Sequence, residues 1–400
     1  FHRAQAEQIE MRAVIILAVL VFVSVVGSTL GESTKRTFIV GGWLPDAPGQ
    51  PPQTPESIAK TLAPIFQDYL TDAVGKKMDP PAQFIFRGVD VDEYTSSHDL
   101  IESGGMDFLY SLPGGIACRA SEFPWVPLAT QQNMVGSMAF GSEALAVFSL
   151  KSNSAISTDK DLKGKRLGCG YLWSGTTYLE GYQVMLDYGL HIYRDMAQVR
   201  FYGAEYEDYY QDVLRGDLDL GFLASSWLVK NHAGDMGRLQ VHDVKESLTY
   251  EGRTYPFPVS RLTPTYGLAA SDKVGWMVKQ KVLLALQALN ASHPGMQLLK
   301  VAGWTSAANY GVVTTSLVKA GVLVDTPSGQ KRCRNPHSAL DIYQSIACPS
   351  DYFKVDFNAS MRQCEAAGQP CPDGVICFCR PCQPKPQNLF SWETVVNLCA

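Results

Sequence analysis

The sequence predicts an α/β fold of two lobes, followed by a small disulfide-rich C-terminal segment. Three observations predict it: strand-like and helix-like runs alternate from about Thr37 to Asp325, the alternation is interrupted once, and eight of the ten cysteines come after residue 330. Alternating strands and helices are typical of parallel βαβ units. With 400 residues, of which 46% are apolar, the chain can bury two cores.

Residues 1–31 have the order of a secretory signal peptide with a few residues upstream of it. Met11-Arg12 precedes the apolar run Ala13–Val26, and small residues follow as far as Gly31. A run of about 14 apolar residues is short for a bilayer, although an uncleaved anchor helix remains an alternative. We expect a secreted protein on the extracellular or periplasmic face, or one tethered to a membrane in a longer chain.

The two-lobed domain is expected over 37–325, and its first lobe takes about 37–145 and the C-terminal part. Thr54 and Pro55 suit the start of a helix whose apolar residues recur on one face, and Pro64 is expected to kink it. The late helices, over 272–291 and 307–320, belong to the C-terminal part. The other elements expected in this lobe are strands over 38–44, 82–89 and 106–112 and helices over 54–75 and 94–103.

The second lobe is expected over about 150–265. Before it, residues 123–150 are strand-like and contain no convincing helix, which suits strands that cross a hinge between lobes. A return strand is expected over 265–271. Within the lobe the pattern predicts strands over 165–171, 198–203 and 217–223 and helices over 177–188 and 205–214.

The Cys-rich tail, residues 333–400, predicts a disulfide framework, because dense, even-numbered cysteines behind a signal peptide are typical of secreted scaffolds. The pairing cannot be deduced from sequence. A metal site in the run CFCRPC is the alternative, but paired CxxC spacing and a nearby His are missing; we expect no cofactor. Asn290 and Asn358 begin glycosylation sequons. The tail cysteines are Cys333, Cys348, Cys364, Cys371, Cys377, Cys379, Cys382 and Cys399.

Four segments resemble, in the same order, blocks of the phosphate/phosphonate-type periplasmic substrate-binding proteins: Gly104–Gly115, Asp161–Leu190, Val213–Leu228 and Gly303–Leu323. The second of them reads DLKGKRLGCGYLWSGTTYLEGYQVMLDYGL. The resemblance implies a type II periplasmic-binding-protein-like fold with hinge strands, as in binding components of ABC transporters and ectodomains of sensor kinases. It also implies capture of a small oxyanion, similar to phosphate or phosphonate, in a cleft between the lobes.

The turn SGTTY, at Ser174–Tyr178, is the main candidate for holding this anion. A helix N-terminus leaves its first N–H groups unpaired and carries a partial positive charge, so it attracts an oxyanion. Gly175 permits close approach of the backbone, and Ser174, Thr176 and Thr177 offer hydroxyl groups. The alternative is that Ser174 only caps the helix.

Weaker candidates follow from the resemblance and from neighbouring positions. Arg119 is the nearest arginine that could bind an oxyanion. The other candidates are Tyr110, Ser111, Gly114 and Gly115 in the first-lobe loop, Tyr171 and Trp173 beside the turn, and Asp219, interpreted as the end of a strand, with Ser225 after it. For each of these residues, an ordinary turn or a core position is the alternative.

Two classes of function receive little support. The net charge of −5 provides no basic surface for nucleic acid. A Cys/His hydrolase would need Cys169 with a histidine such as His191, His232 or His242, but Cys169 lies in an apolar strand and no catalytic motif is present. We therefore expect a binding protein and no enzyme.

The expected output is sensing, because eight thiols after the domain suit the juxtamembrane part of a receptor ectodomain with a fused signalling domain. The alternatives are a soluble protein that delivers its ligand to a membrane permease, and a secreted adhesive or structural protein that uses the Cys-rich tail for contacts.

Overall fold

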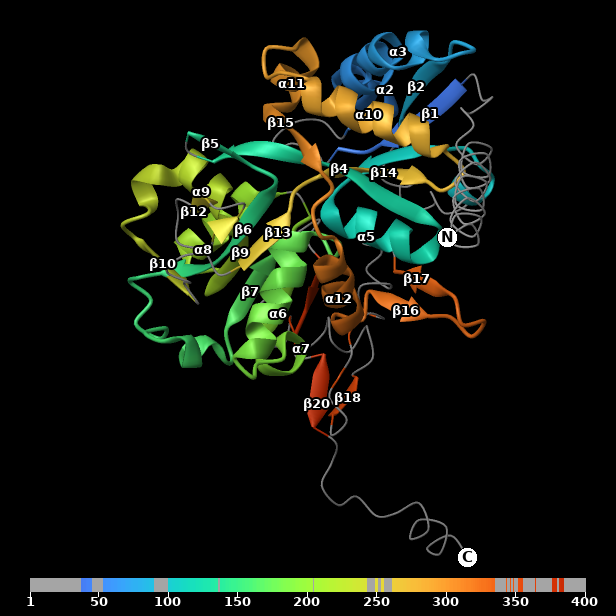
Figure 1. Cartoon of the computed structure of the whole chain (residues 1–400). Coiled ribbons are helices and arrows are strands. Elements are labelled where there is room, and N and C mark those ends of the chain that lie inside the picture. The colour runs from blue at the N-terminus through green and yellow to red at the C-terminus, as the bar shows by residue number, and fades with distance from the viewer. Residues whose placement is uncertain are drawn as a thin grey trace, which may run out of the picture.

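The computed structural model describes residues 37–44, 53–89, 100–135, 137–203, 205–242, 249–250, 253–254, 261–334, 343, 346, 348, 352–354, 364, 376–379 and 381–384. Within these ranges the chain forms two α/β lobes, each built on a seven-stranded sheet (Figure 1). No helix in the described part has the length and apolar character to cross a membrane. The expected signal peptide, the sequon at Asn358, Cys371 and Cys399 lie outside it.

The first sheet has the strand order β15-β4-β14-β3-β1-β2, and β5 pairs with β4. The neighbouring strands β3, β1 and β2 are parallel, as predicted, and β4, β14 and β15 run antiparallel to their neighbours. The strands are β1 (Thr37–Gly42), β2 (Gln83–Gly88), β3 (Phe108–Ser111), β4 (Trp125–Val135), β5 (Met138–Phe140), β14 (Gly267–Ser271) and β15 (Val301–Ser306).

The first long helical segment confirms the expected cap, and its helix type changes at Pro64, where a kink was expected. Thr54 accepts a hydrogen bond from the Ser57 amide at 3.2 Å and caps α2 (Pro55–Ala63). At Pro64 the chain changes to the π-helical segment η1 (Pro64–Tyr69), because proline has no N–H for the α-helical ladder. The other helical elements of this lobe are α3 (Leu70–Ala73), η2 (Gly75–Lys77), α5 (Pro113–Glu122), α10 (Trp276–Ala288), α11 (Pro294–Leu299) and α12 (Gly311–Lys319).

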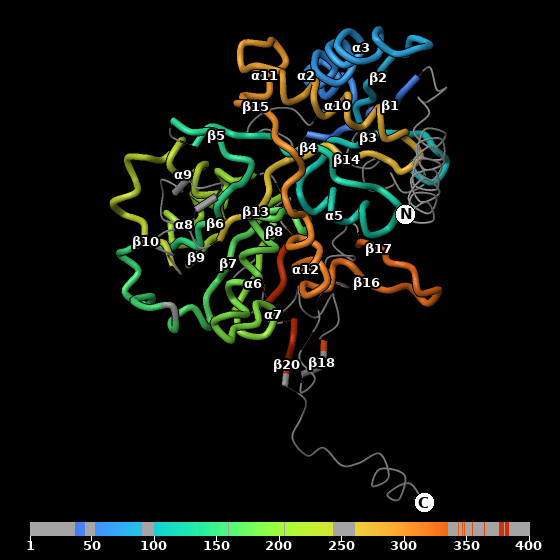
Figure 2. Tube along the Cα trace, viewed as in Figure 1, coloured from blue at the N-terminus to red at the C-terminus, as the bar shows by residue number. Residues whose placement is uncertain are grey.

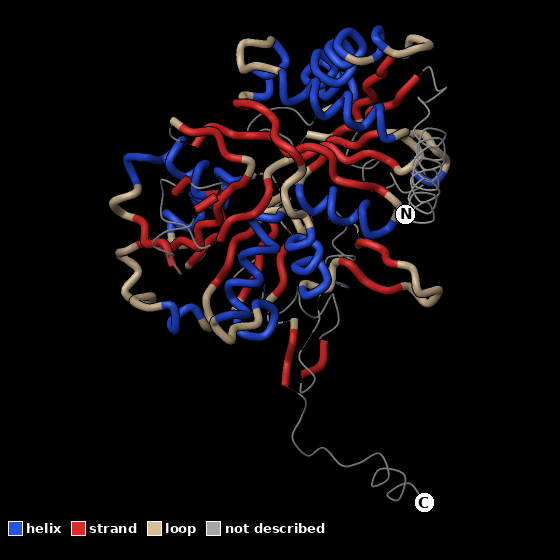
Figure 3. The backbone as a smooth tube through the Cα atoms, viewed as in Figure 1, coloured by secondary structure: helices blue, strands red, loops and turns tan. Residues whose placement is uncertain are grey.

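The second sheet has the order β10-β6-β9-β7-β8-β19, and β13 pairs with β6. The strands β7, β8 and β9 are parallel, and helices cover the sheet (Figure 3). The strands are β6 (Ser142–Leu150), β7 (Arg166–Cys169), β8 (Gln198–Phe201), β9 (Leu220–Ala224), β10 (Leu239–His242), β13 (Arg261–Pro264) and β19 (Ile376–Phe378). The helical elements are η3 (Asp159–Leu162), η4 (Gly175–Leu179), α6 (Glu180–Asp187), α7 (Ile192–Asp195), α8 (Tyr206–Arg215), α9 (Ser225–His232) and η5 (Ala233–Asp235).

The chain passes from the first sheet to the second between β5 and β6, and it returns between β13 and β14 (Figure 2). The two crossings are hydrogen-bonded to each other, since the Thr265 amide donates to Gly141 O at 3.2 Å and the Gln131 amide to Tyr266 O at 2.8 Å. The strand-like stretch over 123–150 therefore supplies crossing strands, as the sequence predicts.

Several elements differ from the expectation. The residues Pro113, Gly114 and Gly115 begin helix α5, and α9, α11 and β15 were not expected. Proline is favoured in the first helical turn, where its missing N–H costs nothing, and this signal was read as a strand ending in a turn. Most of the helix expected over 94–103 lies outside the described residues.

The Cys-rich tail is attached to both lobes. Cys333 forms a disulfide with Cys118 of α5, so the framework is not confined to the tail cysteines, and this part of the prediction is wrong. Cys348 pairs with Cys382 and Cys364 with Cys379, and Cys377 is also disulfide-bonded. Strand β19 extends the second sheet beside β8. Three two-stranded ribbons complete the described part: β11 (Thr249–Tyr250) with β12 (Arg253–Thr254), β16 (Leu323–Asp325) with β17 (Lys331–Cys333), and β18 (Tyr352–Lys354) with β20 (Cys382–Pro384).

Candidate functional site

A small cavity lies where the two lobes meet. Its volume is about 40 Å³, and a water molecule needs about 10–15 Å³ of such volume. It opens beyond the carboxyl ends of β3 and β7, which is where ligands bind in open α/β sheets. The lining comes from both lobes and from the second crossing: Leu112, Pro113, Glu143, Tyr171, Ser174, Gly175, Thr176, Thr177, Tyr206, Pro264, Thr265 and Tyr266.

The predicted turn lines this cavity from the second lobe. Ser174 caps η4: its Oγ accepts a hydrogen bond from the Thr177 amide at 3.0 Å and another from Thr177 Oγ1 at 2.7 Å. A hydroxyl oxygen has two acceptor positions and one hydrogen, so the hydrogen of Ser174 is left to donate. Thr176 is 5% exposed and faces the same cavity. The capping role and a ligand role of Ser174 are thus compatible.

A second helix N-terminus reaches the cavity from the first lobe. Helix α5 has ten residues, and its N-cap position, Leu112, provides no side-chain cap. A Cβ atom at Gly114 would lie 1.9 Å from Trp173 O, and one at Gly175 would lie 3.3 Å from Pro113 Cβ. The starts of α5 and η4 therefore meet closely, and their partial positive charges add at one place.

Several lining residues were missed by the sequence analysis, among them Glu143 and Tyr206. Glu143 lies on β6, opposite Thr263 of β13, and accepts a hydrogen bond from Ser226 at 2.7 Å. Burial raises the pKa of the Glu143 carboxyl, and this hydrogen bond opposes the rise. Tyr206 of α8 lies beside it; burial and the charge of Glu143 raise the pKa of its phenol, and a hydrogen bond with Thr177 lowers it.

Three buried hydroxyl groups lie on β6, β13 and α9, and one of them, Thr263 Oγ1, would be 2.6 Å from a Cβ atom at the lining residue Gly175. In the part of the chain that the structure describes, Ser142, Ser225 and Thr263 have side-chain oxygens that are buried without a hydrogen-bond partner. Each is next in sequence to Glu143, Ser226 or Pro264. Ser225, a predicted site residue, is 3% exposed at the start of α9 and does not line the cavity itself. Unpaired buried hydroxyls cost about 1–3 kcal/mol each, so this region suits a polar ligand.

Several predicted site residues lie outside the cavity lining. Tyr110 is 1% exposed and donates to Gln131 Oε1 at 2.6 Å; it stacks on Tyr266, which does line the cavity. Ser111, Gly114 and Gly115 are buried at the end of β3 and the start of α5, next to the lining residues Leu112 and Pro113. Tyr171 lines the cavity and contacts Trp43 edge to face.

Asp219 lies at the amino-terminal ends of the strands of the second sheet, away from the cavity, so its interpretation as the end of a strand is wrong. It precedes β9 and binds the amide and guanidinium of Arg166 at 2.8–3.0 Å, at the start of β7. Burial raises the pKa of Asp219, but the hydrogen bonds from Arg166 outweigh it and lower the pKa overall. The carboxylate thus joins the beginnings of two parallel strands, away from their carboxyl ends.

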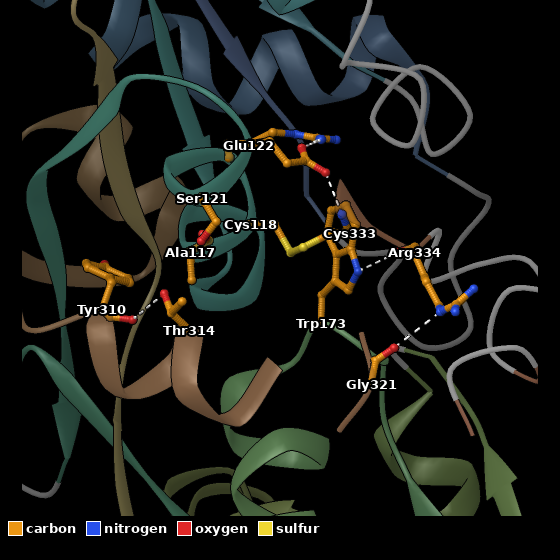
Figure 4. The surroundings of a disulfide bond; sticks show 11 residues. Ala117, Cys118, Ser121, Glu122, Trp173, Tyr310, Thr314, Gly321, Cys333 and Arg334 are labelled. Atoms are coloured by element: carbon orange, nitrogen blue, oxygen red, sulfur yellow. Dashed lines mark hydrogen bonds and ion pairs between the residues drawn. A yellow bond between two sulfur atoms is a disulfide. The ribbon is translucent and has the colours of Figure 1, made fainter. Parts of the chain in front are cut away.

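Trp173 links the turn to the Cys-rich tail (Figure 4). Its Nε1 donates to Arg334 O at 2.7 Å, and the Arg119 guanidinium lies 5.4 Å from its ring. Arg119 also forms a buried ion pair with Glu122, which accepts a hydrogen bond from the Cys333 amide at 2.6 Å. Arg119 and Trp173 therefore position the loop and do not line the cavity.

The hydrolase alternative is not supported by the geometry. Cys169 is fully buried, its thiol donates to Arg200 O at 3.3 Å, and burial raises the pKa of the thiol well above its ordinary value. His191, His232 and His242 contact Tyr182, Glu207 and Ser149, respectively. Among the described residues, no group of three or more His, Cys, Asp or Glu side chains could hold a metal ion.

Comparison with known proteins gives one family match. The model of the family described as "ABC transporter, phosphonate, periplasmic substrate-binding protein" matches residues 50–310. No curated protein matches the chain.

Among solved structures, a Xanthomonas citri protein bound to ATP has 12% identity and a TM-score of 0.48, over 71% of this chain and 98% of its own. PhnD1 from Prochlorococcus marinus in complex with methylphosphonate has 14% identity and a TM-score of 0.45, over 71% and 98%. A binding protein component of an ABC phosphonate transporter from Pseudomonas aeruginosa has 12% identity and a TM-score of 0.44, over 72% and 86%.

Proposed function

Because this chain belongs to the periplasmic phosphonate substrate-binding proteins of ABC transporters, we propose that it captures a small phosphonate or phosphate-like oxyanion in the cavity between its lobes. In this proposal the anion lies against the first turn of η4, near Ser174, Gly175, Thr176 and Thr177, and the start of α5 approaches it from the other lobe. The family implies a place on the periplasmic or extracellular side and delivery of the ligand to a permease.

The meeting of two helix N-termini at one polar cavity carries this proposal. The starts of α5 and η4 lie close enough that a single Cβ atom at Gly114 would clash with Trp173 O. The part of the lining that the structure describes contains no Lys, Arg or His, so in this proposal helix dipoles and hydroxyl donors supply the attraction for an anion. The cavity volume of about 40 Å³ is several times what one water molecule needs, so it has room for a small polar group.

Lobe closure is the expected consequence of binding. The ligand would contact residues of both lobes at once, and only the arrangement in which the lobes meet offers all of these contacts. A ligand shifts a conformational equilibrium in proportion to its preference for one state. The two hydrogen-bonded crossings near Gly141 and Thr265 are the elements that can act as the hinge.

The test is isothermal titration calorimetry with methylphosphonate, phosphate and sulfate on the parent protein and on a Ser174→Ala/Thr176→Ala variant. Two hydrogen bonds to a charged ligand contribute about 1.5–3 kcal/mol each, so the variant should bind at least about a hundredfold more weakly. Equal affinity in variant and parent would reject the turn as the anion site.

A matched control removes another hydroxyl pair. Thr326 Oγ1 and Ser328 Oγ are hydrogen-bonded at 2.8 Å in the exposed turn between β16 and β17, so Thr326→Ala/Ser328→Ala should leave affinity unchanged. Ser174 is also a cap whose loss costs about 1 kcal/mol of stability. The single variant Thr176→Ala, which keeps the cap, should therefore still bind more weakly than the parent.

The receptor role predicted from the Cys-rich tail stays a prediction. The described part of the tail packs on the lobes, since Cys333 is bonded to α5 and β19 joins the second sheet. The tail cysteines therefore do not favour a juxtamembrane spacer over a delivery protein. Sequencing the transcript beyond Ala400 tests the receptor role. A transmembrane segment followed by a kinase or cyclase would support it, and an immediate stop codon would exclude it.

A further inference from the structure

Among the described residues that line the cavity there is one carboxyl group and no basic side chain, which is an unusual composition for an anion site. Glu143 is the acidic residue of the lining, and the other polar side chains are hydroxyls from Ser174, Thr176, Thr177 and Thr265 and the phenols of three tyrosines. An ionised carboxylate next to a bound oxyanion is destabilising, because like charges at close range repel in a partly buried site. A proton between the two groups removes this repulsion.

The surroundings of Glu143 fix one of its oxygens and leave the other to the cavity. Ser226 at the start of α9 donates to Oε1 at 2.7 Å, so Oε2 remains for a ligand. Burial in the absence of a cationic partner favours the protonated carboxyl and raises its pKa. The side chain is thus suited to share a proton with whatever oxyanion binds.

The described groups that line the cavity with Glu143 do not supply a positive charge. Tyr206 comes from α8, Tyr171 from the loop after β7, and Tyr266 from the second crossing; each is a phenol, neutral at physiological pH. On β13, Thr263 lies directly opposite. The nearest cation on that strand, Arg261, is held by Glu180 and Asp187 of α6.

We infer that Glu143 selects for oxyanions that can carry a proton, so that the bound complex holds one proton between Glu143 and the ligand. The inference deepens the proposed function and rests on it. A phosphonate or phosphate monoanion brings this proton with it, and the dianion takes one up at small cost near neutral pH, because the second pKa of a phosphoryl group is about 6. A sulfonate or sulfate has no such proton near neutral pH, so Glu143 must take one from water when it binds.

The bound complex contains one proton shared by Glu143 and the ligand, and this proton comes either from solution or from the ligand. When the free ligand is a dianion and free Glu143 is ionised, binding removes one proton from solution, and affinity falls as pH rises. When the ligand arrives as a protonated monoanion, its own proton fills the position and none is taken up. Selectivity for methylphosphonate over methanesulfonate should therefore be larger at neutral pH than at pH values at which free Glu143 is already protonated.

The experiment is calorimetry with methylphosphonate and methanesulfonate on the parent and on Glu143→Gln, in two buffers with different heats of ionisation. At about pH 8.5, above the second pKa of phosphoryl groups, the parent should take up about one proton with methylphosphonate. At about pH 7 it should prefer methylphosphonate at least about tenfold. Glu143→Gln, which is neutral and keeps similar shape, should take up no proton and lose most of the preference.

The matched control is Glu180→Gln. Glu180 is also a buried glutamate of the second lobe with a serine partner, Ser316, and burial raises its pKa, but it does not line the cavity. This variant should keep the proton uptake and the selectivity of the parent. Equal changes in both variants would overturn the inference, since a general change in charge would then explain them.

The outcomes separate the two proposals. If the parent binds neither methylphosphonate nor phosphate, the proposed function fails. If the parent binds methylphosphonate, and Glu143→Gln retains both the proton uptake and the selectivity, the function stands and the inference about Glu143 fails. A Ser226→Ala variant, which removes the hydrogen bond to Oε1 and leaves the carboxyl in place, should retain the proton uptake and guards against misfolding of Glu143→Gln.

Discussion

At the scale of single residues, the site depends on glycines that allow backbones from two lobes to touch. Gly114 is the clearest case, because a Cβ atom there would lie 1.9 Å from Trp173 O of the other lobe. Real Cβ atoms do not approach an oxygen this closely, so a side chain at this position is incompatible with the observed meeting of the lobes.

We therefore expect Gly114→Ala to lower affinity for methylphosphonate by at least about tenfold, or about 1.4 kcal/mol. The same change should leave the melting temperature of the ligand-free protein equal or slightly higher, since alanine is favoured over glycine in a helix by about 1 kcal/mol. Calorimetry and thermal melts measure both effects. Gly234→Ala, at a position with open space, is the control; an unchanged affinity in Gly114→Ala would show that the lobes bind ligand without this contact.

The sequence located part of the site at this scale. Ser174, Gly175, Thr176, Thr177 and Tyr171, which were predicted to bind the ligand, lie in the cavity lining, because hydroxyls and glycine at a strand-to-helix turn have a local meaning. Tyr110 and Trp173 were also predicted, but they do not line the cavity. The direction of such a side chain depends on packing with residues that are distant in the sequence. Glu143 was missed for a related reason: it begins the run EALAVFSL, and nothing local shows that this strand faces the other lobe.

At the scale of elements, the most consequential piece is β19, which was not predicted as a strand. It pairs antiparallel with β8 and places Phe378, fully buried, between Phe201 and Tyr343 at ring distances of 6.4 and 5.7 Å. The parallel strands β7, β8 and β9 were predicted because they alternate with amphipathic helices. A three-residue strand contributed from more than a hundred residues later has no such periodic signal.

Phe378→Ala should lower the free energy of unfolding by about 3–5 kcal/mol, the cost of removing a buried aromatic ring. Urea unfolding followed by circular dichroism measures it. Leu284→Ala, whose side chain is 62% exposed, should change stability by less than about 0.5 kcal/mol. If both variants lose the same amount, β19 does not belong to the folded second lobe.

At the scale of the whole molecule, the disulfide between Cys118 and Cys333 joins residues 215 positions apart. It holds Arg334 next to Trp173, so the first lobe, the tail and the loop before η4 form one connected group. The general two-lobed architecture was predictable from alternating strands and helices. This connection was not, because the spacing of cysteines carries no information on pairing.

Removal of the bond should lower the free energy of unfolding by about 2–5 kcal/mol. The measurement is urea unfolding of Cys118→Ala, Cys333→Ala and the double variant, arranged as a double-mutant cycle. The double variant should lose little more than either single variant, because each substitution already breaks the same bond. Strictly additive losses would mean that the two cysteines are not bonded to each other.

The long separation of Cys118 and Cys333 also has a consequence for biosynthesis. Cys118 must leave the ribosome as a free thiol, and more than two hundred further residues are made before Cys333 follows. Cys169, which is made before Cys333, or a cysteine of a neighbouring molecule can therefore form a disulfide with Cys118 first. Recombinant production in a reducing cytoplasm would leave the pair unjoined. Material intended for assays should be secreted into an oxidising compartment with a disulfide isomerase, and its thiol count should be checked by mass spectrometry.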